Sequence, residues 1–192
     1  MKRFLYTLVV LLAVAGSDVM AQRGLPGMNS VEFGMDMVDG FHTGNRKDKT
    51  GYAFRLTAQT YAKHGNKWTY GVEMLKRNYP YRDCRIPLWQ YTAEAGYTYN
   101  FYSSPEKLIF LNIGISGMLG YEAVNQGERL LWDGASLPDA ESFLYGGAVS
   151  LEAETYLTDR LVLVLRLRER ILWGGAASLF HTGFGVGIRY IL

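Results

Sequence analysis

FHTGFGVGIRYIL, the stretch Phe180–Leu192, alternates apolar and polar or small side chains at every second position. One set of alternating positions is apolar throughout: Phe180, Phe184, Val186, Ile188, Tyr190 and Leu192. The set between them holds His181, Gly183, Gly185, Gly187 and Arg189. A period of two is that of a β-strand with one apolar and one polar face. If the apolar face is on the inside, the protein is water-soluble; if the polar face is on the inside, the apolar face contacts membrane lipid.

The same alternation recurs along the chain, with no helical segment between its occurrences. It predicts eight strands, over 30–38, 51–62, 67–77, 88–101, 107–121, 143–157, 161–172 and 179–192. Short connections (63–66, 102–106, 158–160) alternate with long ones (39–50, 78–87, 122–142), and 173–178 is intermediate. An even number of strands with short turns on one rim and long loops on the other is typical of outer-membrane barrels. We therefore predict an all-β fold, an eight-stranded antiparallel outer-membrane β-barrel with both termini periplasmic.

The N-terminus has the pattern of a secretory signal. Lys2 and Arg3 precede an apolar run of about twelve residues, too short for a membrane-spanning helix, and Val19-Met20-Ala21 offers a cleavage site. We predict a signal peptide over residues 1–21 and a single transmembrane β-barrel domain over residues 22–192. The chain left after cleavage is nearly neutral, which does not favour direct binding of nucleic acid. We expect no small-molecule substrate and, because no His/Cys cluster has metal spacing, no metal or other cofactor. Cys84 stands alone, so no intramolecular disulfide is possible.

A water-soluble barrel of the lipocalin type would show the same alternation with its apolar side chains inside. Three features favour the opposite arrangement, in which the polar face lines the lumen. Its charged residues are almost all Arg, Asp and Glu, and we expect the lysines only in loops or at strand ends. Its many glycines would make room in a narrow lumen, and aromatic residues such as Trp68 and Trp89 fall near strand ends, where a membrane girdle belongs.

Charged side chains inside so narrow a barrel should pair, because burying each one alone would cost several kcal/mol. The predicted lumen network comprises Glu32, Asp36, Arg55, Glu73, Glu94, Glu152, Glu154, Arg166, Arg168, Arg170 and Arg189. It predicts a plugged barrel rather than an open pore; a narrow ion path is the alternative. Glu169 breaks the pattern because alternation puts it on the apolar face.

Candidate functional residues are few. His181 begins the last strand within possible reach of Ser178 and Glu169, as a Ser–His–carboxylate set would need, but no motif surrounds it. We favour a lumen or rim histidine with a hydrogen-bond partner. The long loops offer candidate partner surfaces at Tyr79, Tyr81 and Arg82 and, in an otherwise polar loop, at Leu130, Leu131 and Trp132. The second group would either fold its loop over the barrel mouth or bind a partner.

Several stretches resemble one known family. They include KHGNKW at 63–68, NYPYRDCRIPLWQYTAEAGY at 78–97, GYEAVNQGERLLWDGASL at 120–137, YGGAVSLEAETYLTDR at 145–160 and RERILWG at 168–174. On these, the sequence resembles the TraO family of conjugative-transposon proteins from Bacteroides-type bacteria.

The resemblance implies a part in the mating apparatus that moves DNA between cells, and it brings no catalytic residues. We expect a non-enzymatic structural or assembly component of the outer membrane, in contact with its lipid and with other conjugative transfer proteins. A surface adhesion or recognition barrel and a lipid-modifying barrel enzyme are the alternatives.

Overall fold

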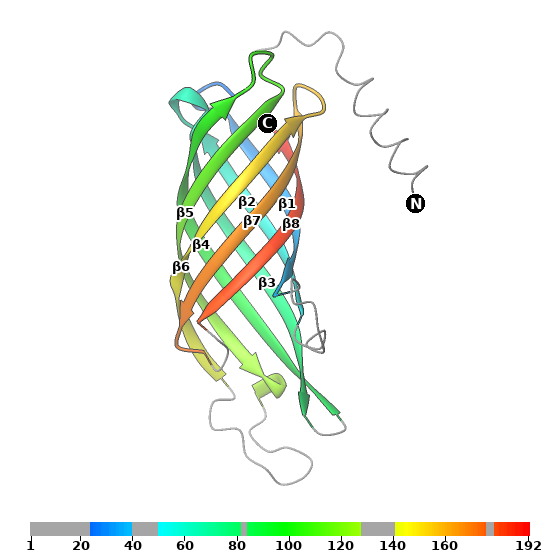
Figure 1. Ribbon diagram of the computed structural model, residues 1–192. Coiled ribbons are helices and arrows are strands. Elements are labelled where there is room, and N and C mark those ends of the chain that lie inside the picture. Colours follow the sequence, from blue (N-terminus) through cyan, green and yellow to red (C-terminus); the bar gives the residue numbers. More distant parts are fainter. Residues whose placement is uncertain (1–23, 40–49, 82–83, 128–140, 176–178) are drawn as a thin grey trace, which may run out of the picture.

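The computed structural model describes residues 24–39, 50–81, 84–127, 141–175 and 179–192 (Figure 1). These residues form eight strands and two short 3₁₀ turns. The strands are β1 (Asn29–Val38), β2 (Gly51–Tyr61), β3 (Lys67–Tyr81), β4 (Cys84–Ser103), β5 (Ile109–Val124), β6 (Glu141–Tyr156), β7 (Leu161–Trp173) and β8 (Phe180–Ile191). The turns are η2 (Lys63–Gly65) and η3 (Asn125–Gly127). Among the described residues, no helix combines the length and the apolar character that crossing a bilayer requires.

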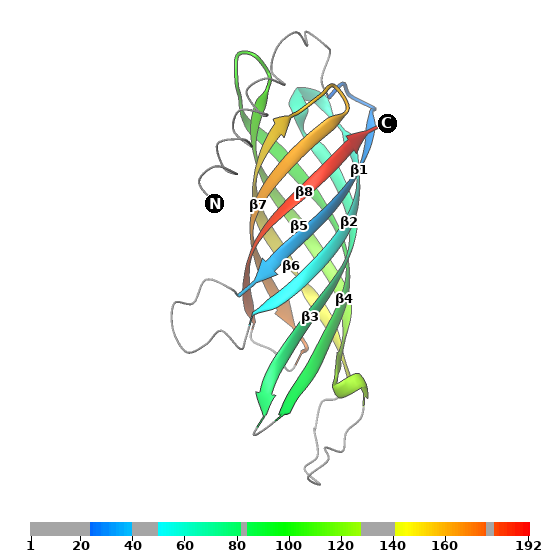
Figure 2. The same cartoon turned by 90° about the vertical axis from the view of Figure 1, so that its right-hand side faces the viewer.

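The strands form one closed barrel. Each strand pairs antiparallel with the next, and β8 returns to pair with β1 in a register that joins Glu32 to Arg189. The two views show strongly tilted strands around one axis, with the C-terminus at the end of the barrel where the short turns lie (Figures 1 and 2). We call this the short-turn end and the opposite one the long-loop end. The predicted eight-stranded antiparallel barrel is confirmed.

The alternation of side chains sorts them to the two sides of the sheet wall. Outward-facing apolar residues are widely exposed, for example Phe33 at 58% and Ile115 at 68%, whereas the inward-facing Glu32 and Arg189 have no exposure. A water-soluble barrel has the reverse arrangement, with apolar side chains inside. The outside of this barrel therefore suits a hydrocarbon solvent, and its core is the polar lumen.

Two predicted long loops are shorter than expected. Strands β3 and β4 continue past the rest of the barrel as a paired hairpin, with Asn78 opposite Pro87 and Tyr81 opposite Cys84. Figure 2 shows this hairpin projecting at the long-loop end. The segment 78–87 is therefore mostly strand, contrary to the prediction of a loop. The loop 122–142 is also shortened, since β5 runs on to Val124 and β6 begins at Glu141.

Candidate functional site

The lumen carries the polar chemistry of the described residues, and Glu32 on β1 is one of its centres. Arg166 Nη2 on β7 donates to one carboxylate oxygen at 2.6 Å, and Arg189 Nη2 on β8 donates to the other at 2.7 Å. Gln59 Nε2 on β2 donates to that second oxygen at 3.1 Å. The carboxylate has no exposure to solvent, so two guanidinium groups supply the solvation it would otherwise find in water.

A second centre is Glu73 on β3, nearer the long-loop end. Its carboxylate accepts Arg168 Nη1 at 2.8 Å and also binds Arg170 Nη1, both from β7. Arg55 Nη1 lies 3.9 Å from the same carboxylate and 3.1 Å from Asp36 on β1. Arg168 extends the group further through an ion pair with Glu94 on β4. This group connects five strands, β1 to β4 and β7, across the lumen.

A third group lies toward the short-turn end and contains a lysine. Glu154 on β6 pairs with Arg189 Nη1 at 2.8 Å and with Lys67, whose side chain is 1% exposed. Glu152 accepts Arg166 Nε at 2.7 Å. Lys67 begins β3, at a strand end as expected, but its long apolar stem carries the ammonium into the lumen, where it joins the ionic groups. Lys76 departs from the expectation that lysines lie in loops or at strand ends, since β3 continues to Tyr81 and places Lys76 in its interior, facing outward.

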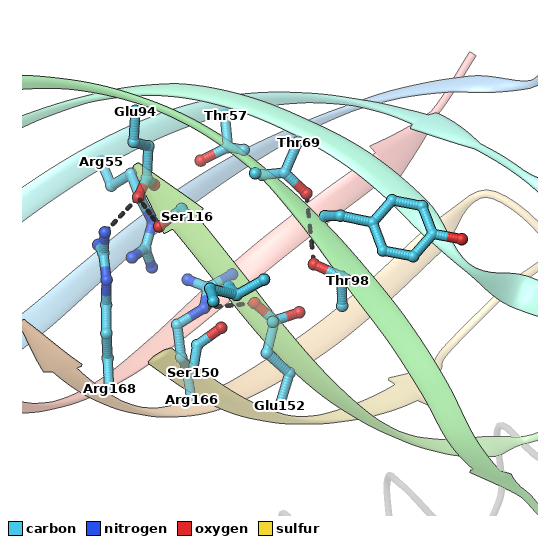
Figure 3. Close-up of a pocket in the computed structure, with 14 residues that line it drawn as sticks. Arg55, Thr57, Thr69, Glu94, Thr98, Ser116, Ser150, Glu152, Arg166 and Arg168 are labelled. Atoms are coloured by element: carbon cyan, nitrogen blue, oxygen red, sulfur yellow. Dashed lines mark hydrogen bonds and ion pairs between the residues drawn. The ribbon is translucent and has the colours of Figure 1, made fainter. Parts of the chain in front are cut away.

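All eleven residues of the predicted lumen network face inward, and each has at least one ion-pair partner. The space left among them is small. A cavity among them has a volume of about 30 Å³. Its lining includes the hydroxyl groups of Thr57, Thr98 and Ser116 together with Glu94 and Arg168 (Figure 3). It has room for about two water molecules.

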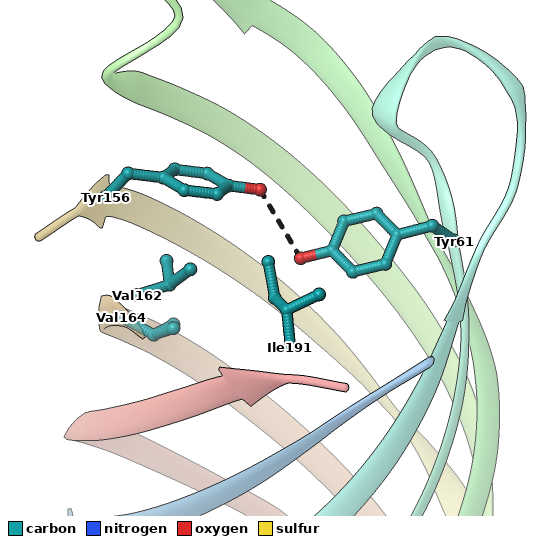
Figure 4. Close-up of a cluster of buried hydrophobic side chains, with 5 residues drawn as sticks. All are labelled: Tyr61, Tyr156, Val162, Val164 and Ile191. Carbon is teal, nitrogen blue, oxygen red and sulfur yellow. Dashed lines mark hydrogen bonds between the residues drawn. The ribbon is translucent and has the colours of Figure 1, made fainter. Parts of the chain in front are cut away.

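Apolar clusters close the lumen above and below the ionic groups. At the short-turn end, five residues from four strands pack together, and the hydroxyl oxygens of Tyr61 and Tyr156 lie 3.5 Å apart (Figure 4). The others are Val162, Val164 and Ile191, with Met28 and Phe110 against them. Toward the long-loop end, one cluster contains Met118, Leu144, Ala148 and Leu172 and another contains Val38, Ala53 and Leu75. The lumen is thus layered apolar, ionic and apolar along the barrel axis.

A polar cluster at the long-loop end joins three segments through Asp39, which directly follows β1. Its Oδ2 lies 2.8 Å from Nδ1 of the buried His181 and is bound by Arg77 Nη2; its Oδ1 accepts the Thr182 backbone N–H at 3.1 Å. Partial burial opposes ionisation of Asp39, but hydrogen bonds from His181 and Arg77 and their charges outweigh it and lower its pKa to about 2.

The structure does not bring His181 and Glu169 together, although the sequence allowed it. His181 points into the lumen, whereas Glu169 is on the outer side of β7 and accepts a hydrogen bond from Thr182 Oγ1 at 2.6 Å. The two lie on adjacent strands but on opposite faces of the sheet, as alternation demands. Ser178, the third residue of the possible set, lies outside the described residues.

The candidate partner residues are only partly visible. Tyr79 and Tyr81 belong to β3, so their backbone is in the projecting hairpin rather than in a loop. Arg82, Leu130, Leu131 and Trp132 fall outside the described residues. In the described part of the chain, no group of three or more His, Cys, Asp or Glu side chains could hold a metal ion.

Sequence reasoning missed several lumen residues. Glu122 was expected in a loop, but it is fully buried on β5 and accepts Gln90 Nε2 at 2.7 Å. Asp39 and Arg77 were assigned to no site. Alternation carried one residue past the predicted strand end at Tyr121 would have placed Glu122 inward, and alternation within the predicted strand 67–77 would have placed Arg77 inward.

Comparisons with known proteins identify both a family and a fold. The model of the family described as conjugative transposon protein TraO matches residues 25–192. A search of curated proteins finds no match.

Solved structures similar to this chain are outer-membrane barrels. Ail, the attachment invasion locus protein of Yersinia pestis, has a TM-score of 0.57 and 12% identity over 88% of this chain and 100% of its own. Neisserial surface protein A has a TM-score of 0.56 and 15% identity over 85% of this chain and 95% of its own. OprG from Pseudomonas aeruginosa has a TM-score of 0.50 and 12% identity over 91% and 99%. At these identities the likeness concerns the fold: an eight-stranded outer-membrane β-barrel.

Proposed function

The chain belongs to the TraO family of conjugative transposon proteins, and from this premise we propose that it is a structural, non-enzymatic component of the transfer apparatus. Family and fold together make it an outer-membrane barrel of conjugative transfer. The proposal adds the kind of work it does: it holds other transfer proteins at the membrane rather than conducting DNA or modifying lipid.

The filled lumen is the observation that carries this proposal. The Arg–carboxylate groups around Glu32 and Glu73 occupy the middle of the barrel, and the cluster around Tyr61 and Tyr156 occupies the short-turn end. The cavity left between them accommodates about two waters, so a nucleic-acid strand has no path through the barrel. A barrel with no passage acts through its surfaces.

Those surfaces are the two rims, since lipid covers the outer wall. In the orientation we propose, the short-turn end and both termini face the periplasm, after removal of residues 1–21 as a signal peptide. Partners among the transfer proteins would contact exposed turn residues such as Lys63, His64 and Glu106 on that side, or the projecting β3–β4 hairpin and the long loops on the other.

Transfer frequency from a donor strain that lacks the gene tests this function. We expect transfer to fall by orders of magnitude and to return when the wild-type gene is supplied. Unchanged transfer in the deletion strain would refute a role in conjugation and would favour a surface adhesion barrel.

Two variants separate a structural role from an enzymatic one, provided that both reach the outer membrane in normal amounts. His181→Ala should restore transfer if the barrel is non-enzymatic, whereas loss of transfer with a normally assembled barrel would favour chemistry at this histidine. Replacement of Leu130, Leu131 and Trp132 by Ser should reduce transfer if this loop contacts a partner.

A further inference from the structure

Lys76 is an unusual residue for the outer wall of this barrel. It lies in the interior of β3, in register with Tyr52 on β2 and Trp89 on β4, all three facing outward. Among the residues whose side chains the structure describes, it is the one cation at an outward-facing strand position. The line Tyr52–Lys76–Trp89 has the composition of an interfacial girdle, in which amphipathic rings mark the level of lipid headgroups.

The ammonium group of Lys76 is held in place by an aromatic ring, and among the described residues no carboxylate pairs with its charge. Its Nζ lies 4.8 Å from the centroid of the Trp89 ring, within the range of a cation–π contact. The indole covers one side of the ammonium and stops the long side chain from sampling solvent freely, while the N–H donors on the other side stay available for an anion. Lys67, by contrast, is buried against Glu154 inside the lumen.

An apolar groove of about 750 Å³ begins beside this pair on the same outer wall. Met74, two residues before Lys76, lines it, as does Tyr91, whose ring stacks on that of Trp89 at 6.5 Å with planes 6° apart. The groove is deeper at Ala93, because the methyl side chain of this residue is smaller than neighbouring side chains such as that of Leu119. The groove extends from Met74 and Tyr91, beside this pair, to Leu56 and Val72, nearer the middle of the barrel.

We propose that Lys76, Trp89 and this groove form a binding site for a phosphorylated lipid of the leaflet at the long-loop end. The ammonium complements the phosphate charge, and the groove beside it receives an acyl chain. The glycerol or sugar part of the headgroup would lie between them, against the faces of Tyr52 and Tyr91. The proposal goes beyond the role in transfer and does not depend on it.

Lipid retention measured by native mass spectrometry tests this site on the full-length mature chain in neutral detergent. The probes are phosphorylated lipid A and the same lipid A with its phosphate removed. We expect the wild type to retain about tenfold more of the phosphorylated form, which corresponds to one charge-assisted contact. Lys76→Gln should remove this preference and Lys76→Arg should keep it.

The matched control is Lys63→Gln, which removes the same charge from an exposed turn at the other end of the barrel and should leave the preference unchanged. Equal retention of both lipids by the wild type, or a preference that survives in Lys76→Gln, would overturn the proposal. So would displacement of the lipid by millimolar inorganic phosphate, because the site would then be one for the free anion. A donor that transfers normally without the gene would refute the conjugation role and leave the lipid result standing.

Discussion

Each buried charge in this barrel is stabilised by the hydrogen-bond and ion-pair partners of that one residue. Glu32 is the clearest case, because its carboxylate receives two guanidinium groups and one amide and no solvent. A buried ion pair contributes little net stability compared with an apolar pair of the same shape. Removing one partner, however, leaves the other charge buried and unpaired in a medium of low dielectric constant, which is strongly destabilising. The residue-scale predictions follow from that asymmetry.

Glu32→Gln should destabilise the barrel by about 3–5 kcal/mol, because Arg166 and Arg189 lose the charge they share at this position. The change is nearly isosteric, so lost packing contributes little. Urea unfolding in lipid vesicles, followed by the mobility shift of the folded barrel on cold gels, measures the loss. Glu106→Gln, at an exposed turn, should change stability by less than about 0.5 kcal/mol. A loss at Glu32 no larger than at Glu106 would show that the network is not needed.

Asp39 should make the long-loop end sensitive to acid. Its pKa in the folded barrel, about 2, is below the ordinary value of 3.8, so its ionised form adds stability that is complete above about pH 4 and disappears as the pH falls toward 2. Asp39→Asn should therefore be less stable than the wild type near neutral pH, and the difference should vanish near pH 2. Paired unfolding curves across this range check it. A difference that stays constant with pH would mean that ionisation of Asp39 is not the cause.

At the scale of single strands, alternation predicted which residues face the lumen, but it did not predict where strands end. The hairpin of β3 and β4 shows why. Pro80 and Pro87 give 78–87 the look of a loop, because proline cannot donate to a neighbouring strand. Beyond Arg77, which is opposite Gly51, and Leu88, which is opposite Val124, each of these strands has a neighbour on one side only. Proline costs little at such free edges, so tertiary context overrides the local signal.

Glycines in the strands differ sharply in the space around them, and this difference predicts which of them can be replaced by alanine without loss of stability. A Cβ at Gly146 on β6 would lie 2.0 Å from the carbonyl oxygen of Ile171 on β7, whereas at Gly117 on β5 nothing lies within 4 Å. Gly146→Ala should push β6 and β7 apart and cost about 1–3 kcal/mol, while Gly117→Ala should be neutral. The same urea assay compares them, and equal stabilities would contradict the close approach.

At the scale of the whole molecule, the lumen is a core with inverted chemistry: ionic in the middle and apolar at the ends. The sequence allowed prediction of the inward face and of pairing between Arg and carboxylates. It could not assign partners, because Arg166 reaches across β8 to Glu32, a contact set by the shear of the closed sheet rather than by any spacing in the chain. The inward reach of Lys67 was not predicted, because a lysine at a strand end was expected to stay outside the lumen, although alternation with the outward-facing Trp68 puts it on the inner face.

A barrel filled in this way should not conduct. We expect purified wild-type protein in planar bilayers to show no large, steady channel, because the Tyr61–Tyr156 cluster and the Glu32 group both block the axis. The double variant Tyr61→Ala and Glu32→Ala, if it folds, should raise the frequency of small openings by removing both obstructions. Stable conductance of the size of an open porin in the wild type would overturn the filled-lumen interpretation.

The pairing of Glu32 with Arg189 spans the seam where the last strand meets the first. While that seam is open in a membrane, the Glu32 carboxylate on β1 lacks both Arg166 and Arg189, and such an unpaired charge near hydrocarbon is unfavourable by several kcal/mol. A partly closed sheet is therefore high in free energy, and the ion pair between Glu32 and Arg189 stabilises the closed barrel. We infer that β8 pairs with β1 late in folding and in one step. The same step then forms the ion pairs of the lumen and completes insertion into the membrane.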